Sequence, residues 1–235
     1  SSGDDYLLNV GQSCHERLER ALMSRDRCAG HAFAREAGYG DEAAYYFDVE
    51  LLMLSAALDS VAHVAHVAHG VGGDAWNVGW RRAEWRRRLQ TAAPAIWTAT
   101  EPGTRGRDAI EIVAILRNTI HGEGMRQVTV AGGPQHEEQL QVSPALLPAL
   151  IDCMSRHGGG SEWGLMGSTG SPRLAPAVFA QRVVALVADA TNELMALTDV
   201  SLLPGVDPKD VMTGPAIDGM FEPALTNRVR LLAGI

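Results

Sequence analysis

The residues DEAAYYFDVELLMLSAALDSVAHVAHVAHG, numbers 41–70, decide the fold class of this 235-residue chain. Their apolar side chains recur with the period of an α-helix over a longer distance than anywhere else in the sequence. Asp41 is a favourable N-cap residue, and Gly70 stands where a C′ glycine commonly ends a helix. The stretch therefore predicts one long helix from Asp41 to about His69.

Helical patterns also occur on both sides of this segment. They predict helices over residues 6–27, from about Asp74 to Gln90, over Arg107–His121, from Pro144 (after the N-cap Ser143) to Arg156, and along 179–197. Pro148 is expected to bend the helix predicted over Pro144–Arg156 in its second turn. Because strands and helices do not alternate as in a βαβ fold, we predict an all-α fold, a bundle of about six helices.

After the fourth predicted helix the apolar period changes to two residues. Val128 and Val130 precede the turn residues Gly132-Gly133-Pro134, and Leu140 and Val142 follow them. This alternation predicts a small β-hairpin insertion at 125–143. We expect a loop over 158–171, a single helical-bundle domain over 1–198, and a proline- and glycine-rich C-terminal tail over 199–235.

Composition limits the classes of function. The net charge of −8 disfavours nucleic-acid binding except at a local basic patch. Cys14, Cys28 and Cys153 are odd in number and form no CxxC pair, so neither a disulfide framework nor a thiolate zinc site is predicted. No signal-peptide pattern is visible, and no apolar run approaches the roughly 20 residues that cross a bilayer. We expect a soluble, cytoplasmic protein without a membrane partner.

The end of the predicted fourth helix has the residues best suited to chemistry. Arg117 and His121 are four residues apart, and Asn118 and His121 three apart, so these side chains are neighbours on a helix. Histidine transfers protons near neutral pH, and arginine stabilises charge on a phosphoryl group, which together suit metal-free phosphodiester cleavage. In the structural alternative, the helix dipole stabilises the histidine and Arg117 pairs with Glu111, Glu123 or another acid.

Arg117-Asn118 followed by His121-Gly122, near the end of a helix in a helical bundle, resembles the signature of HEPN domains, the higher eukaryote and prokaryote nucleotide-binding family. The resemblance spans roughly residues 42–157. Many members are metal-independent ribonucleases of toxin–antitoxin, abortive-infection and RNA-processing systems, and they act as dimers whose motifs line a shared cleft.

For this chain the resemblance implies attack of a ribose 2′-hydroxyl on phosphorus, without a cofactor. Arg117 would be the motif arginine that stabilises the transition state, Asn118 its polar neighbour, and His121 the catalytic histidine acting as acid or base. The resemblance further implies a homodimer, with RNA and a cognate protein as candidate partners.

The spacing of the motif departs from the family pattern. Family members usually have four to six residues between arginine and histidine, whereas three separate Arg117 from His121. One residue fewer rotates the histidine by about 100° on a helix, so either the helix is locally adjusted or the site has moved away from catalysis. The chain is also similar to uncharacterised actinobacterial proteins with the run Arg-Asn-Thr-Ile-His-Gly-Glu, a hairpin and a later Trp-Gly, here Trp163-Gly164, which suggests a bacterial source.

Three histidines recur three residues apart at the end of the long helix, at His63, His66 and His69. Neighbouring pairs could reach one metal ion, but neither HExxH nor a Glu-x-x-His pair occurs, so no metal site is predicted. A polar helix face or a dimer interface is favoured. In a third interpretation, these histidines line the same cleft as His121 from a facing helix.

A dense basic cluster covers residues 81–88, interleaved with Trp76, Trp80 and Trp85. Arginine and aromatic side chains together bind single-stranded RNA through phosphate pairing and base stacking. The candidate RNA-binding residues are Arg81, Arg82, Trp85 and Arg86. A solvated helix face, with Trp76 and Trp80 in an apolar stripe, is the favoured alternative.

Two classes of function remain open from the sequence. The first is a HEPN-like, metal-independent endoribonuclease acting at a dimer cleft. The second is a non-catalytic helical interaction module of the same fold, in which Arg117 and His121 fix the helix end to the hairpin. A small-molecule or metal-binding helical bundle is a further alternative. Exposure of Arg117 and His121 in a positively charged cleft would favour the enzyme.

Overall fold

A computed structural model describes residues 3–32, 39–122, 126–129 and 138–198 of the chain. Within these residues the fold is mostly helical with a small antiparallel sheet, which confirms the predicted helical fold class. The predicted tail at 199–235 lies outside the described residues, and the division into one domain and a tail stays a prediction.

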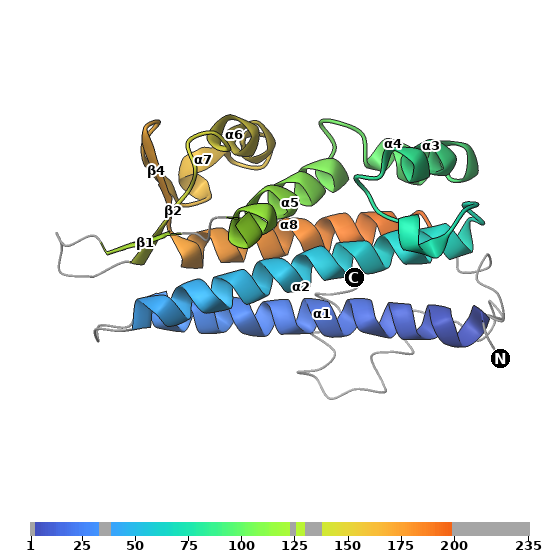
Figure 1. The fold of residues 1–235 in the computed structure, drawn as a ribbon, viewed down its shortest axis with the longest axis horizontal. Coiled ribbons are helices and arrows are strands. Elements are labelled where there is room, and N and C mark those ends of the chain that lie inside the picture. Colours follow the sequence, from blue (N-terminus) through green and yellow to red (C-terminus); the bar gives the residue numbers. More distant parts are fainter. Residues whose placement is uncertain (1–2, 33–38, 123–125, 130–137, 199–235) are drawn as a thin grey trace.

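Two long helices, α1 (Gly3–Ala32) and α2 (Tyr39–Ala68), run side by side in opposite directions along the molecule (Figure 1). α5 (Arg105–Gly122) and α8 (Pro176–Ala196) pack against them. α2 has nearly the predicted boundaries, because its apolar positions form a continuous buried face. Members of this face are Phe47, Leu51, Leu54, Ala57, Leu58 and Val61.

An aromatic group within the core packs α2 against α8. Phe47 and Phe179 pack edge to face with ring centroids 5.7 Å apart, and Trp163 lies 5.4 Å from Phe179. All three rings are buried. Burial of a side chain of this size stabilises a fold by roughly 1.5–3 kcal/mol, so this aromatic group fixes the positions of the two helices.

The expectation that no apolar stretch is long enough to cross a bilayer is wrong for α2. By length and composition Glu42–Ala68 could span a membrane, because an apolar 18-residue stretch within it has a mean hydropathy of 1.5. However, 56% of this apolar stretch is buried within the fold, as in the core helix of a soluble protein. Its packing against three other helices accounts for its apolar composition, and a cytoplasmic location stays a prediction.

The single helix predicted from Asp74 to Gln90 is also wrong. The segment contains a 3₁₀ turn, η1 (Ala75–Asn77), an irregular loop over 78–82, and α3 (Ala83–Ala92). The Asp74 carboxylate accepts a hydrogen bond from the Trp76 backbone N–H, which favours the short turn over a continuous helix. Trp76 is 90% exposed and Trp80 only 3%, so the two do not share an apolar stripe.

α4 (Pro94–Ala99) follows α3 in a region where no helix was predicted. The N-terminus of α5 approaches it closely at Gly106. A Cβ atom at this position would lie 2.4 Å from the Ala99 carbonyl oxygen, so glycine is required there. This contact fixes the beginning of α5, the helix that carries the candidate motif.

The sheet has the order β1-β2-β4-β3, and all neighbours are antiparallel. β1 (Arg126–Thr129) pairs with β2 (Glu138–Gln141) as predicted for the hairpin, whose expected turn at 132–134 lies outside the described residues. β3 (Leu165–Ser168) and β4 (Ser171–Leu174) form a second hairpin, which begins in the segment 158–171 that was expected to be a loop. Leu140 pairs with Leu174 and so joins the two hairpins.

The short helices α6 (Leu147–Ser155) and α7 (Gly159–Glu162) connect the two hairpins. α6 begins three residues later than predicted, after a turn at Pro144. Pro148 therefore lies in the first turn of α6, where its missing N–H removes no helical hydrogen bond. The predicted bend in the second turn does not occur.

Candidate functional site

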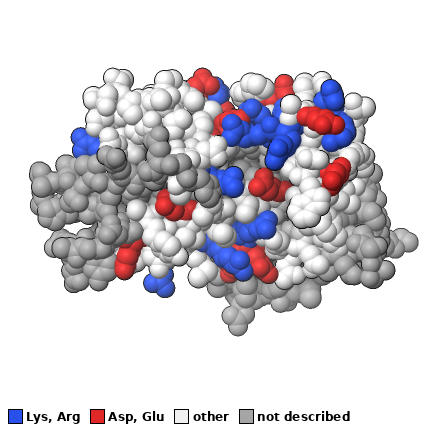
Figure 2. All heavy atoms as spheres, viewed as in Figure 1, with Lys and Arg blue, Asp and Glu red and all other residues white. Residues whose placement is uncertain are grey.

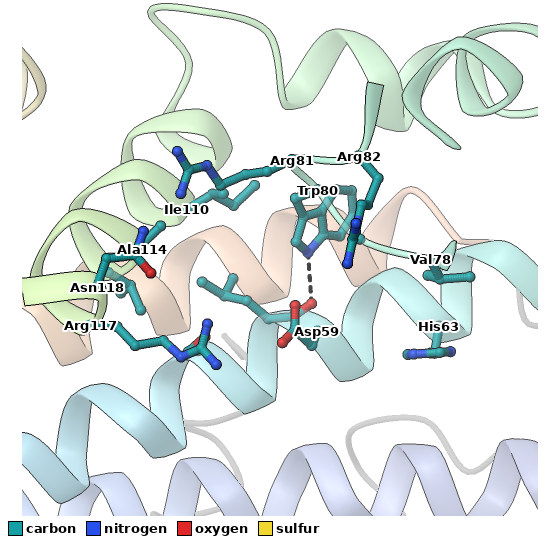
Figure 3. Close-up of a pocket in the computed structure, with 14 residues that line it drawn as sticks. Asp59, His63, Val78, Trp80, Arg81, Arg82, Ile110, Ala114, Arg117 and Asn118 are labelled. Atoms are coloured by element: carbon teal, nitrogen blue, oxygen red, sulfur yellow. Dashed lines mark hydrogen bonds between the residues drawn. The ribbon is translucent and has the colours of Figure 1, made fainter. Parts of the chain in front are cut away.

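A pocket of about 470 Å³ lies between α2, α5 and the loop over 78–82 (Figure 3). Its volume is within the roughly 300–1,000 Å³ range of small-molecule sites. Two of the three residues predicted to be catalytic line it, together with two of the predicted RNA-binding arginines. The polar lining includes Asp59, His63, Arg81, Arg82, Arg117 and Asn118.

α5 places Arg117 and Asn118 in this pocket. Val113 and Leu116 face the core, whereas Arg117 extends toward Asp59 on α2 (Figure 3). Among the described residues, the Arg117 guanidinium has no hydrogen-bond or ion-pair partner. Glu111, a predicted partner, instead pairs with Arg107 at 2.6 Å.

The position of His121 follows from the regular course of α5. The helix is α-helical as far as Gly122, so the local adjustment considered for the short Arg–His spacing does not occur in it. His121 is thus four helical residues beyond Arg117. The side chain of His121, like the other predicted partner Glu123, lies outside the described part of the chain.

α2 contributes an acid and a histidine that are one helical turn apart. Partial burial in the concave pocket raises the pKa of Asp59, while the charges of Arg117, His63 and Arg17 act in the opposite direction. Burial lowers the pKa of His63, Asp59 counteracts this effect, and Arg17 adds to it. The Tyr6 hydroxyl lies 3.0 Å from His63 Nδ1.

The loop over 78–82 is fixed to α2 by Trp80. Its buried indole donates a hydrogen bond from Nε1 to the Leu58 carbonyl at 2.7 Å, beside Asp59 (Figure 3). Because Trp80 is anchored, the next two residues, Arg81 and Arg82, lie at the edge of the pocket. Arg81 has Glu111 at 3.9 Å, while Arg82 has no ion pair with the described residues.

Two of the four candidate RNA-binding residues have structural positions instead, which corrects the sequence-based expectation. Trp85 is 1% exposed and packs edge to face on Trp80, so its ring is not available to stack on a base. Arg86 donates to the Thr100 carbonyl at 3.1 Å and pairs with Glu101. These two side chains connect α3 to the bundle and to the end of α4.

The three histidines of the run have three different environments. His63 lines the pocket, His66 Nδ1 accepts a hydrogen bond from Trp85 Nε1 at 3.3 Å, and His69 Nε2 is buried without a partner in the described chain. No group of three or more potential metal ligands is found among the described residues. Of these three histidines only His63 lines the pocket that Arg117 enters. Whether they share a cleft with His121 stays a prediction.

The pocket is positively charged although the chain is acidic. Three arginines line it against the single carboxylate of Asp59, while the whole chain has a net charge of −8. Figure 2 shows basic side chains gathered on this face of the molecule. Guanidinium groups near a shared cavity favour an anionic ligand, and phosphate is the anion that arginine forks fit best.

Comparison with known proteins finds no matching family model, no matching curated protein and no matching solved structure. Function must therefore be inferred from the site. Asp59 is the charged residue of the pocket that sequence reasoning missed, although the Asp59-x-x-x-His63 spacing within the long helix is visible in the sequence.

Proposed function

We propose that the chain is a HEPN-like, metal-independent ribonuclease and that this pocket binds the phosphate at the cleavage site. The observation that carries the proposal is Arg117, whose guanidinium makes no hydrogen bond or ion pair with the described residues and opens into a pocket shared with His63 and Asp59. A structural arginine at the end of a core helix would be expected to have an acidic partner.

Each polar side chain has a role in this proposal. Arg117 neutralises the charge that grows on the non-bridging phosphate oxygens in the transition state. Asn118, exposed beside it, has an amide that can hydrogen-bond to phosphate or sugar oxygens. His121 transfers a proton, and Arg82 holds an adjacent phosphate of the strand. No cofactor is required for these steps.

We further propose that the active form is a homodimer whose two motifs face each other across a cleft, as the family resemblance implies. RNA and a cognate regulatory protein are the proposed partners. The alternative of a non-catalytic module needs Arg117 to fix the end of α5 to the hairpin. Arg117 makes no such contact with the described hairpin residues, so the open pocket favours the enzyme.

The test is cleavage of mixed-sequence, single-stranded RNA in EDTA by the purified full chain. We expect cleavage by the wild type and its loss in Arg117→Ala and His121→Ala. Arg105→Ala is the matched control, because Arg105 is on the same helix but pairs with Glu193 outside the pocket. Absence of wild-type cleavage, or equal cleavage by all four proteins, contradicts the proposal.

A further inference from the structure

The α2 side of the pocket has an arrangement that the Arg117-Asn118-His121 motif does not include. Asp59 and His63 are four residues apart on α2, so they lie on the same face, and both line the cavity that Arg117 enters from α5. His63 Nδ1 is held by the Tyr6 hydroxyl at 3.0 Å. His63 Nε2 has no hydrogen-bond partner among the described residues.

We infer that His63, held by Tyr6 and lying one helical turn from Asp59, is a second proton-transfer residue of the site in addition to the motif histidine His121. This inference rests on the proposed ribonuclease function and adds to it. The family motif provides one histidine and one arginine from a single helix, whereas here a facing helix provides the second histidine.

The reaction requires two proton transfers. In the first step His63 Nε2 accepts the proton of the ribose 2′-hydroxyl while its oxygen forms a bond to phosphorus. The bond from phosphorus to the 5′-oxygen of the next nucleotide breaks, and His121 gives that oxygen a proton. The products are a 2′,3′-cyclic phosphate and a free 5′-hydroxyl, so all atoms and protons are accounted for without an added reactant.

The tautomer needed for this role agrees with the observed contact. When His63 donates its Nδ1–H to the Tyr6 hydroxyl oxygen, the lone pair is at Nε2. Asp59 stabilises the imidazolium that forms after proton uptake. His66 is a contrasting case three residues later, because its Nδ1 accepts from the buried Trp85 indole and its role is structural.

The groups around His63 make it the base at neutral pH. They are Tyr6 and Arg17 on α1 and Asp59 and His66 on α2. Arg117 on α5 and Arg82 on the loop line the same pocket. Burial and the charge of Arg17 lower the pKa of His63, and Asp59 reduces this effect. The imidazole is therefore mostly neutral near pH 7 and able to accept a proton.

The substrate class follows from this chemistry. A base at His63 acts on a 2′-hydroxyl, so the substrate must be RNA and the nucleotide before the cleaved bond must be a ribonucleotide. An otherwise identical strand with a single 2′-deoxy residue at that position should bind and remain uncut. If the enzyme leaves this strand uncut, the position of its 2′-deoxy residue identifies the bond that is cleaved in the all-ribose strand.

The experiment is single-turnover cleavage of a labelled single-stranded RNA in EDTA between about pH 5 and pH 9, with the full-length wild type and three variants. For His63→Ala we expect a loss of about 10²- to 10⁴-fold, the usual contribution of a general base. We also expect loss of the acidic limb of the pH profile and partial rescue by added imidazole. His63→Gln preserves a hydrogen bond to Tyr6 and should be equally inactive if folded.

His69→Ala is the matched control, since it removes a histidine of the same run that does not line the pocket. If the wild type cleaves RNA and His63→Ala cleaves it at the same rate, the inference is overturned and the ribonuclease proposal stands. Loss of activity with both limbs of the pH profile retained also overturns it, because that result indicates a structural role. If the wild type does not cleave RNA, both proposals fail.

Discussion

An aspartate, an arginine and a histidine come together near each end of α5, but their bonding differs between the two ends. Near its beginning, Asp108 is 1% exposed, accepts two hydrogen bonds from Arg156 at 2.7 and 2.8 Å, and lies 2.9 Å from His157 Nε2. Near its end, Arg117 enters an open pocket with Asp59 and His63. In the first group each member bonds to another, whereas the structure shows no hydrogen bond among the members of the second.

This difference separates a structural group from a candidate functional one. A buried carboxylate is tolerated when charged hydrogen-bond donors satisfy both of its oxygens, as they do for Asp108. Unpaired charges in a solvent-accessible pocket contribute little to folding but are available to a ligand. Residue type is the same in both groups, so only their contacts distinguish them.

The largest expected effect is on catalysis. Arg117→Ala should reduce RNA cleavage by about 10³-fold, equivalent to about 4 kcal/mol of transition-state stabilisation, because it removes a cation aimed at the phosphate. Its free energy of unfolding should remain within about 0.5 kcal/mol of the wild type. Parallel cleavage assays and urea denaturation would measure both quantities. Strong destabilisation by Arg117→Ala would show that Arg117 is structural, like the group around Asp108.

The next effect is on stability, at the opposite end of α5. Asp108→Ala should lower the free energy of unfolding by about 3 kcal/mol, because Arg156 and His157 lose their shared acceptor. Asp59→Ala should change it by less than about 0.5 kcal/mol, since that carboxylate has no hydrogen-bond partner in the described fold. Equal losses in the two variants, measured by chemical denaturation, would show that Asp59 is also structural.

The sequence predicts the long helices well but not the connections between them. α2 is long and has a continuous apolar face, so its period together with Asp41 and Gly70 indicates its boundaries to within about two residues. The β3–β4 hairpin lacks such a signal, because each strand has only four residues and these include Gly167 and Pro172. A Cβ at Gly167 would lie 2.4 Å from the Ser171 carbonyl oxygen, so the turn requires glycine there. Glycine is uncommon inside strands, so its presence hides the strand from a prediction based on residue type.

The candidate site shows the same limit. The i,i+4 spacing and residue chemistry identify Arg117 and Asn118 without a structure. The different positions of His63 and His66 depend on Tyr6 and Trp85, which are distant in sequence and reach the run only in the folded chain. Periodicity describes one helix at a time, so it does not indicate which histidine faces the pocket.

A third prediction concerns another buried acid, Glu50, whose two carboxylate oxygens have no hydrogen-bond partner among the described residues. Burial raises its pKa well above the usual value, the charge of Arg25 opposes this, and that of Asp26 adds to it. Because the pKa of Glu50 is raised in the folded state, its protonated form stabilises the fold fully at low pH. This contribution to the free energy of unfolding is lost as the pH rises and the carboxyl ionises. Glu50→Met should therefore be more stable than the wild type by about 1–2 kcal/mol near pH 8.

The advantage of Glu50→Met should shrink near pH 4, where most of the wild-type carboxyl is protonated even in the unfolded chain. Urea denaturation at the two pH values measures this difference. Asp108→Met is the comparison, because removing a paired acid should destabilise the protein at neutral pH. Destabilisation by Glu50→Met at both pH values would indicate that Glu50 has a compensating partner.

The smallest expected effect separates a free arginine from a bound one within the basic cluster. Arg82 has no ion pair with the described residues, whereas Arg86 is held by Thr100 and Glu101. With an uncleavable 2′-O-methyl strand, Arg82→Ala should weaken binding by about 1 kcal/mol and reduce the salt dependence of log K by about 0.7, the release of one counterion from a single strand. Arg86→Ala should leave that slope unchanged and lower stability instead. If Arg82→Ala leaves the salt dependence of log K unchanged, the edge of the pocket does not bind phosphate. In that case, the lack of an ion pair is not a sign of a functional arginine in this cluster.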